Sequence, residues 1–189
     1  MSPLRINTIK HLLDLHPDYT YYFFTDRTSN EFVKEKFPQY WELYDSFISG
    51  AYRADLFRGL ALKYYGGYYL DCKASVIMPF GNWPYVICDD MLASIASLSF
   101  NGFMASPQNS ELIDMYIRYI VDLAKTKAAY IGPLALTKAY TALKIEPNFM
   151  EYSPTVISVD DKVVKKVSDN TIVTKSRFPH SYLINYILI

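Results

Sequence analysis

The chain has 189 residues, of which 51% are hydrophobic and 20% charged, a composition typical of a folded globular protein and not of a disordered one. Its 19 basic residues balance 19 acidic ones, so the positive field that attracts proteins to nucleic acid is missing. No apolar run approaches the roughly 18 residues of a membrane helix, and no secretory signal is recognisable. Cys72 and Cys88 are too few for a disulfide framework. We therefore expect a single cytoplasmic domain over residues 1–189, without a membrane segment.

Helices and strands are expected to alternate over the first two thirds of the chain. Thr28 and Glu31 have the spacing of a capping box, which predicts a helix that begins at Thr28 and ends before Pro38. The other patterns predict helices over 6–13, 40–48 and 51–65, a helix through 126 that Asn109 or Ser110 caps, and a helix beginning at 132. They also predict strands over 19–25, 68–71, 84–88 and 100–106.

The last third of the chain is richer in strand signals. Segments 155–159, 162–167 and 171–175 alternate or are β-branched, and a turn signal at 168–170 separates the last two. The sum is an α/β domain with a mixed central sheet, flanking helices and a β-rich C-terminal part. In such sheets ligands bind outside the carboxyl ends of the strands, and the strand 68–71 delivers Asp71 to such an end.

The segment 53–73, RADLFRGLALKYYGGYYLDCK, gathers the candidate functional residues. Asp55 and Arg58 are three residues apart on the expected helix, so a carboxylate and a bidentate donor share one face. They form either a surface ion pair worth less than about 1 kcal/mol, or contacts to a sugar hydroxyl and a phosphate. The spacing by itself favours the surface pair.

As a whole, this segment resembles the core motif of the DXD-containing sugar-binding glycosyltransferases of the family-32 type, which are related to yeast-type mannosyltransferases, capsule enzymes and clostridial glucosylating toxins. HPDYTYYFFTD, NGFMASPQNS and YIGPLALT are also similar to segments of this family, and the resemblance covers most of residues 15–154. It implies a GT-A fold and transfer of a sugar from a UDP- or GDP-sugar to a glycan or glycoprotein acceptor, usually with retention of configuration.

The resemblance also implies roles for individual residues. Asp55 and Arg58 would hold the ribose and the sugar of the donor, and Asp71 would be the first aspartate of the DXD motif and a metal ligand. These three are the candidate catalytic residues. The candidate donor-binding set adds the nearby Arg53, Gly66 and Gly67, where glycine would let the nucleotide approach the backbone closely, Tyr69, which would line the pocket, and Lys73.

Lys73 stands where the family motif has its second aspartate, which binds Mn²⁺ or Mg²⁺. An ammonium group two residues from Asp71 repels a divalent ion, so metal binding should be weak. Lys73 could instead supply the positive charge itself, which would make the transferase metal-independent, or it could be a solvated surface lysine. Asp89, Asp90 and His180 are further candidate metal ligands.

Three classes of function remain open at this point. The first is a glycosyltransferase, and the second is a non-catalytic sugar-nucleotide or glycan-binding module derived from one. Lys73 favours the second, as does the expectation that the family's opening strand has no counterpart before Met1. The third is a structural domain in which the aromatic residues serve only the core. The motifs of P-loop, dinucleotide-binding, α/β-hydrolase and zinc-protease sites do not occur in the sequence.

Overall fold

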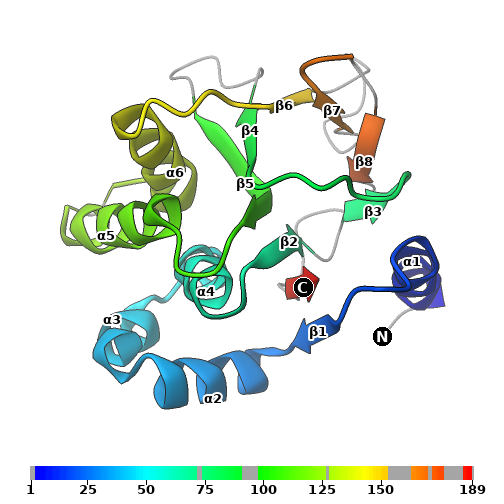
Figure 1. The fold of residues 1–189 in the computed structure, drawn as a ribbon. Coiled ribbons are helices and arrows are strands. Elements are labelled where there is room, and N and C mark those ends of the chain that lie inside the picture. The colour runs from blue at the N-terminus through cyan, green and yellow to red at the C-terminus, as the bar shows by residue number, and fades with distance from the viewer. Residues whose placement is uncertain are drawn as a thin grey trace.

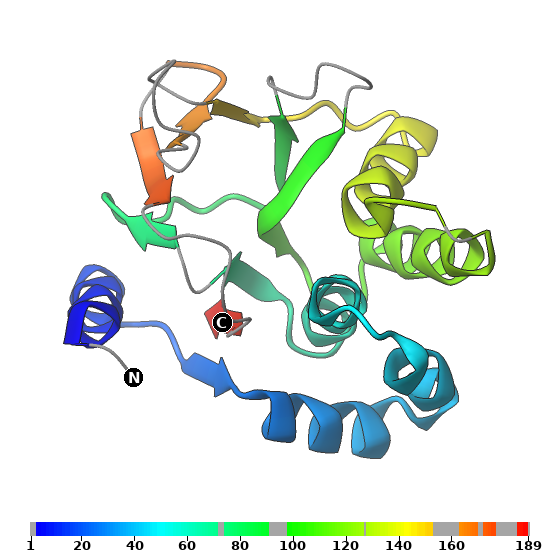
Figure 2. The same cartoon turned by 180° about the vertical axis from the view of Figure 1, so that it is seen from behind.

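The computed structural model describes residues 3–71, 74–90, 98–126, 128–152, 163–169, 172–176 and 185–188. Nine strands of this part of the chain form one sheet in the order β1-β9-β2-β5-β4-β6-β7-β8-β3. Helices α2 to α6 gather on one side of the sheet and α1 lies on the other side (Figure 1; Figure 2 shows the reverse view).

The helical segments are α1 (Pro3–Leu15), α2 (Asp26–Lys36), η1 (Pro38–Tyr40), α3 (Trp41–Ser46), α4 (Gly50–Tyr65), α5 (Glu111–Lys125) and α6 (Ile131–Ala142). The strands are β1 (Tyr21–Phe24), β2 (Gly67–Asp71), β3 (Ala74–Val76), β4 (Val86–Asp90), β5 (Ser99–Ser106), β6 (Phe149–Tyr152), β7 (Val163–Lys166), β8 (Ile172–Ser176) and β9 (Asn185–Leu188). The expected α/β alternation and β-rich C-terminal part are confirmed.

The aromatic strand β2 is buried on both faces. Tyr69 packs into the cluster under α2 to α6, whereas Tyr68 and Leu70 pack into a second cluster together with Leu12 of α1. Successive side chains of a strand point to opposite faces, so a strand covered on both sides needs apolar residues at every position. Asp71 is two residues after Tyr69, so its side chain projects from the same face of the sheet, the one that the helices α2 to α6 cover.

Several strands bring their carboxyl ends to the same edge of the sheet. β5 is antiparallel to both β2 and β4, and β6 is parallel to β4, so β2, β4 and β6 all run in one direction. Asp71 ends β2 and Asp90 ends β4 at this edge, which is the place predicted for Asp71.

The pairing of β4 with β5 is irregular next to this edge. Val86 pairs with Ala105 and Cys88 pairs with Phe100, so a step of two residues in β4 faces a step of five residues in β5. The extra residues of β5 include Asn101, whose side chain is thereby free to point toward the helices. Irregularities of this kind re-aim side chains beside functional sites.

One predicted helix start is wrong. The capping box joins Thr25 and Thr28, not Thr28 and Glu31: the Thr25 hydroxyl accepts from the Thr28 N–H, and the Thr28 side chain accepts from the Thr25 N–H. α2 therefore begins at Asp26, because extended backbone at Thr25 allows its hydroxyl to reach over the first turn. Glu31 instead pairs with Arg27 on the surface of α2.

The other predicted elements are confirmed where the structure describes them. Gly66 ends α4, Ser110 caps α5, and β7 pairs with β8 as an antiparallel hairpin. The predicted strand at 155–159 lies outside the described residues. Among those residues, no helix combines the length and the apolar character needed to cross a bilayer.

Candidate functional site

Helix α4 carries Asp55 and Arg58 into the interior of the protein. Asp55 is 6% exposed and Arg58 4% exposed, and all residues of α4 from Ala54 to Leu62 are buried. The surface ion pair that spacing alone favoured is therefore wrong, because α5 and α6 cover this face of α4. Charged side chains are almost never buried unless they are paired, so their partners define the site.

Asp55 is surrounded by donors from three elements. Its Oδ1 accepts from Asn101 Nδ2 at 2.8 Å and lies 3.3 Å from Arg58 Nη2, and its Oδ2 accepts from the Gly132 N–H at 3.2 Å. A Cβ at residue 132 would lie 2.3 Å from Asp55 Cγ, so only glycine allows the first turn of α6 to come this close. The carboxylate thus joins α4, β5 and α6.

Arg58 connects Asp55 with the end of β2. Its Nε donates to Ala54 O at 3.2 Å, its Nη1 donates to Asn101 O, and its Nη2 lies 3.6 Å from Asp71 Oδ1. The guanidinium carbon stacks 4.8 Å from the ring centre of Tyr69, a favourable cation–π arrangement. The guanidinium plane is therefore held in a fixed orientation.

Asp71 is the open end of this network. Its Oδ1 accepts from the Tyr69 hydroxyl at 2.8 Å, and its side chain is 17% exposed, in contrast with the buried Asp55 and Arg58. The chain of contacts runs from Asp55 through Arg58 to a carboxylate at the sheet edge. A ligand at this edge can reach Asp71 directly, while Asp55 and Arg58 hold it in place from behind.

The charges of the network follow from burial and from the partners. Burial raises the pKa of Asp55, an effect that Arg58, Asn101 and Gly132 oppose. Burial lowers the pKa of Arg58, but the neighbouring Tyr69 and the two carboxylates raise it by more, so Arg58 remains protonated. Burial also raises the pKa of Tyr69, which keeps its hydroxyl a donor to Asp71.

Other predicted site residues lie apart from this network. Arg53 Nε donates to Phe47 O at 2.8 Å and anchors the connection before α4. Gly66 (φ 73°) and Gly67 (φ 82°) lie at the other end of β2 from Asp71, and a Cβ at residue 66 would lie 2.7 Å from the Gln108 nitrogen. Their left-handed backbone gives a local reason for glycine here, and their predicted role toward a nucleotide stays a prediction.

Asp71 is the candidate metal ligand that the structure describes with its side chain. Lys73, His180 and the side chains of Asp89 and Asp90 lie outside the described part of the chain. Among the side chains that are described, no group of three His, Cys, Asp or Glu residues comes together as a metal cluster. Asp71 is the one carboxylate of the network that is open to solvent. A single carboxylate supplies too few ligands for a metal ion, so a metal at Asp71 would need further ligand atoms from a bound molecule.

The sequence patterns do not identify three members of the network. Asn101 and Gly132 stand in segments that resemble the family, but the resemblance implies no role for either. Tyr116 is the third: its hydroxyl donates to Asp55 O at 2.8 Å, and Asn101 Nδ2 lies 3.3 Å from it. A polar side chain within the otherwise buried strand β5 was the available signal for Asn101.

Residues 3–93 match the family model described as "Glycosyltransferase sugar-binding region containing DXD motif". The matched region includes Asp55, Arg58 and Asp71, three members of the buried network. This region of the chain belongs to the DXD-containing glycosyltransferase family.

Two yeast mannosyltransferases are among the similar proteins. A mannosyl phosphorylinositol ceramide synthase of Saccharomyces cerevisiae is 30% identical over 152 residues, which cover 72% of this chain and 38% of the relative. The inositol phosphoceramide mannosyltransferase 2 of Schizosaccharomyces pombe is 23% identical over 165 residues, which cover 79% of this chain and 46% of the relative. The chain thus spans less than half of the length of these relatives.

A solved glycosyltransferase structure shares the fold. The structure named PaToxG glycosyltransferase superposes with a TM-score of 0.55 at 21% identity, covering 76% of this chain and 65% of that one. The predicted α/β fold of the GT-A type is confirmed by this likeness.

Proposed function

We propose that the chain is the donor-binding part of a glycosyltransferase that uses a nucleoside-diphosphate sugar, a UDP- or GDP-sugar, and transfers the sugar to a hydroxyl of a glycan or glycolipid. The observation that carries this proposal is the buried network that runs from Asp55 through Arg58 to Asp71 at the sheet edge. It lies within the region that belongs to the glycosyltransferase family.

The energetics of the network support a functional role. Removing each ion from water costs several kcal/mol, and apolar residues of similar volume often stabilise a core equally well or better. A domain with a purely structural role would gain little from two carboxylates and a guanidinium at a sheet edge. Burial and four partner atoms, from Ala54, Asn101, Asp55 and Asp71, hold Arg58 rigidly, so Arg58 fixes the position of the one carboxylate that a ligand at the sheet edge can reach.

The reaction breaks the bond between the anomeric carbon and the diphosphate oxygen and forms a bond from that carbon to the acceptor oxygen. The nucleoside diphosphate leaves with the electron pair of the broken bond, and its oxygen accepts the proton that the acceptor hydroxyl loses. In our proposal Asp71 contacts the donor sugar, Arg58 orients Asp71 from behind, and Asp55 fixes Arg58. Retention of the anomeric configuration is part of the proposal.

A divalent ion, Mn²⁺ or Mg²⁺, would be held by Asp71 and the donor diphosphate. When bound, it supplies positive charge that stabilises the leaving diphosphate. Lys73 follows Asp71 by two residues and would bring positive charge to the same region, so dependence on metal is an outcome of the experiment below.

The relatives suggest the sugar and the acceptor. Their names describe transfer of mannose to inositol phosphoceramide. We carry both over as part of the proposal: the transferred sugar is mannose, and the acceptor is a lipid whose headgroup bears hydroxyls.

The deciding experiment is thermal unfolding with UDP, GDP and GDP-mannose, each with Mn²⁺ and then with EDTA. A ligand at 100 times its Kd stabilises the fold by about 2.7 kcal/mol, which raises Tm by about 5–10 °C for a chain of this size. Asp71→Asn should abolish the shift, whereas Asp122→Asn, an exposed change on α5, should keep it. An unchanged Tm with every nucleotide would contradict the proposal.

Turnover separates an enzyme from a binding module. GDP-mannose or UDP-sugar hydrolysis, followed by nucleotide release, should accompany binding if the chain is a transferase, and proton NMR of the product reports the anomer. Binding without turnover would support the non-catalytic module. A shift that survives EDTA would indicate a metal-independent site.

A further inference from the structure

An apolar groove lies beside the buried network, between the connection from α3 to α4 and the connection from α5 to α6. We define it by Leu43, Phe47, Ile48, Tyr52, Ala128 and Ile131, and its volume is about 520 Å³. The helices that frame it lie together on one side of the sheet (Figure 1). None of the described residues that line it carries a charge. Its size is in the range of small-molecule sites, which are mostly apolar.

The groove adjoins residues that hold the buried end of the network. Ile131 lines it, and the next residue, Gly132, donates its N–H to Asp55. Tyr52 also lines it and precedes Asp55 by three residues, so both lie on one side of α4. The groove therefore reaches to within about one helical turn of Asp55, the buried carboxylate of the network.

The walls of the groove are held in place by side chains. The Arg53 Nε donates to Phe47 O at 2.8 Å, and the rings of Phe47 and Tyr52 pack edge to face with centres 6.0 Å apart. Arg53, predicted as a donor-site residue, thus supports the wall of this groove. Such support indicates a groove that exists before any ligand binds.

Apolar surface is exposed at the mouth of the groove. Among the described residues, the two most exposed large hydrophobic side chains are Ile48, at 100%, and Tyr130, at 68%. Ile48 lines the groove, and Tyr130 lies in sequence between the lining residues Ala128 and Ile131. Tyr130 also has a left-handed backbone (φ 55°), which is uncommon for a bulky residue. Exposed apolar residues around a concave site mark it as a binding surface.

We propose that this apolar groove binds one hydrocarbon chain of the lipid acceptor and thereby places the acceptor headgroup beside Asp71 and the donor sugar. The inference rests on the proposed function. An alkyl chain matches a groove without charges, and the polar side chains of the lining, Ser46, Ser49 and Tyr52, carry hydroxyls only.

The test uses hexyl, octyl and decyl maltoside, each below its micelle concentration, with maltose as the headgroup control. Each methylene that enters the groove should tighten binding about fourfold, the equivalent of its transfer free energy. Ala128→Trp fills the groove and should weaken decyl maltoside binding about tenfold or more, the equivalent of two methylenes. Ala129→Trp, one residue further and outside the lining, is the matched control and should bind as the wild type does.

A second variant protects the test against misfolding of Ala128→Trp. Ile48→Glu changes a fully exposed side chain, so the fold should be unaffected, yet a charge at the mouth should weaken binding of the decyl chain. Equal affinities for hexyl and decyl maltoside, or equal loss with both tryptophan variants, would overturn the proposal. Binding to phosphatidylcholine vesicles that Ile48→Glu removes while maltoside affinity stays unchanged would indicate a membrane-contact face and would also overturn it.

Nucleotide binding by the same variants distinguishes the two proposals. Ala128→Trp should keep the thermal shift with nucleotide. If nucleotides bind and maltosides do not, the groove proposal fails by itself. If maltosides bind with the expected chain-length dependence and no nucleotide does, the proposed transferase function fails.

Discussion

The two faces of the central sheet both bury polar groups, but they use them differently. On the face covered by α2 to α6, the charged network leads outward to the partly exposed Asp71. On the face covered by α1, His16 is buried and both of its ring nitrogens are satisfied: Nε2 accepts from the Phe80 N–H at 2.8 Å, and Nδ1 bonds Leu12 O at 2.8 Å. The hydrogen bonds of His16 are all made within the protein and attach α1 to the segment at Phe80. The charged network instead ends at Asp71, a carboxylate that a ligand can reach.

The largest effect should come from removing the charge that holds the open network together. Arg58→Met leaves Asp55 and Asp71 without their cation, and breaking a buried ion pair in this way costs about 3–5 kcal/mol. Urea unfolding measures the loss. Arg118→Met, at an exposed position of α5, is the control and should have little effect. A loss below about 1 kcal/mol for Arg58→Met would show that the network is not energetically coupled.

A change at the other end of β2 sharpens the comparison, because it should lower stability without touching the site. Gly66→Ala places a side chain on a residue with φ 73° and a Cβ 2.7 Å from the Gln108 nitrogen. Strain of this kind costs about 1–3 kcal/mol. The folded variant should still bind nucleotide in the thermal-shift assay. Loss of binding by a folded Gly66→Ala protein would instead give this glycine a direct role in the donor site.

The hydrogen bonds of His16 on the α1 face should respond to acid. Burial lowers the pKa of His16 below the ordinary value of 6.5, and protonation of Nε2 would break its bond with Phe80. As the pH falls, the unfolded chain binds this proton before the folded protein does. The contribution of His16 to the free energy of unfolding is therefore complete above pH 6.5 and is lost as the pH falls toward the folded pKa. The loss is at most about 1.4 kcal/mol per pH unit.

The measurement is the pH dependence of urea unfolding for wild type and His16→Asn. The difference between the two curves should change below pH 6.5 and stay constant above it. His11→Asn, an exposed change on the same helix, is the matched control. Parallel curves for wild type and His16→Asn over the whole range would contradict the assignment of a neutral, buried imidazole.

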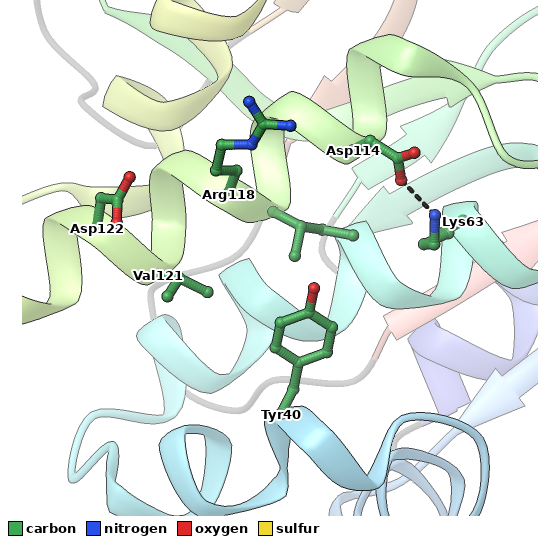
Figure 3. Close-up of a pocket in the computed structure, with 7 residues that line it drawn as sticks. Tyr40, Lys63, Asp114, Arg118, Val121 and Asp122 are labelled. Carbon is green, nitrogen blue, oxygen red and sulfur yellow. Dashed lines mark hydrogen bonds and ion pairs between the residues drawn. The ribbon is translucent and has the colours of Figure 1, made fainter.

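The smallest effect is expected where charges meet in solvent. Lys63 of α4 and Asp114 of α5 form an ion pair across a surface pocket (Figure 3), with side chains 29% and 44% exposed. Exposed pairs contribute about 0–1 kcal/mol. A double-mutant cycle with Lys63→Met and Asp114→Asn should give a coupling energy in this range that decreases further in high salt. A coupling energy above about 2 kcal/mol would show that Lys63 and Asp114 interact as strongly as a buried ion pair does.

Local patterns predicted most of the fold. Gly66 and Ser110 mark helix ends by their own chemistry, and the apolar periodicity located α4 and α5. β3, β6 and β9 were not predicted, and length alone does not explain this, because β1 and β7 are similarly short and were predicted. Their existence depends on partners far away in sequence.

The site was predicted in part for a related reason. The family resemblance selected Asp55, Arg58 and Asp71, and the structure brings all three into one network. Asn101 and Gly132 are 46 and 77 residues from Asp55, so neither spacing nor periodicity could connect them with it. Burial of Arg58 is likewise decided by packing of α5 and α6, which a helix pattern does not contain.

The position of β9 has a consequence for how the chain folds. β1 pairs with β9 among the described strands, and β9 also pairs with β2, so the strand nearest the N-terminus joins the sheet through the strand nearest the C-terminus. Contacts of such long sequence separation close late and slow folding, because the entropy of the intervening chain must be lost first. During synthesis the backbone of β1 can therefore pair with β9 only after Asn185–Leu188 has left the ribosome. A chaperone that shields this edge would find its target at Tyr21–Phe24.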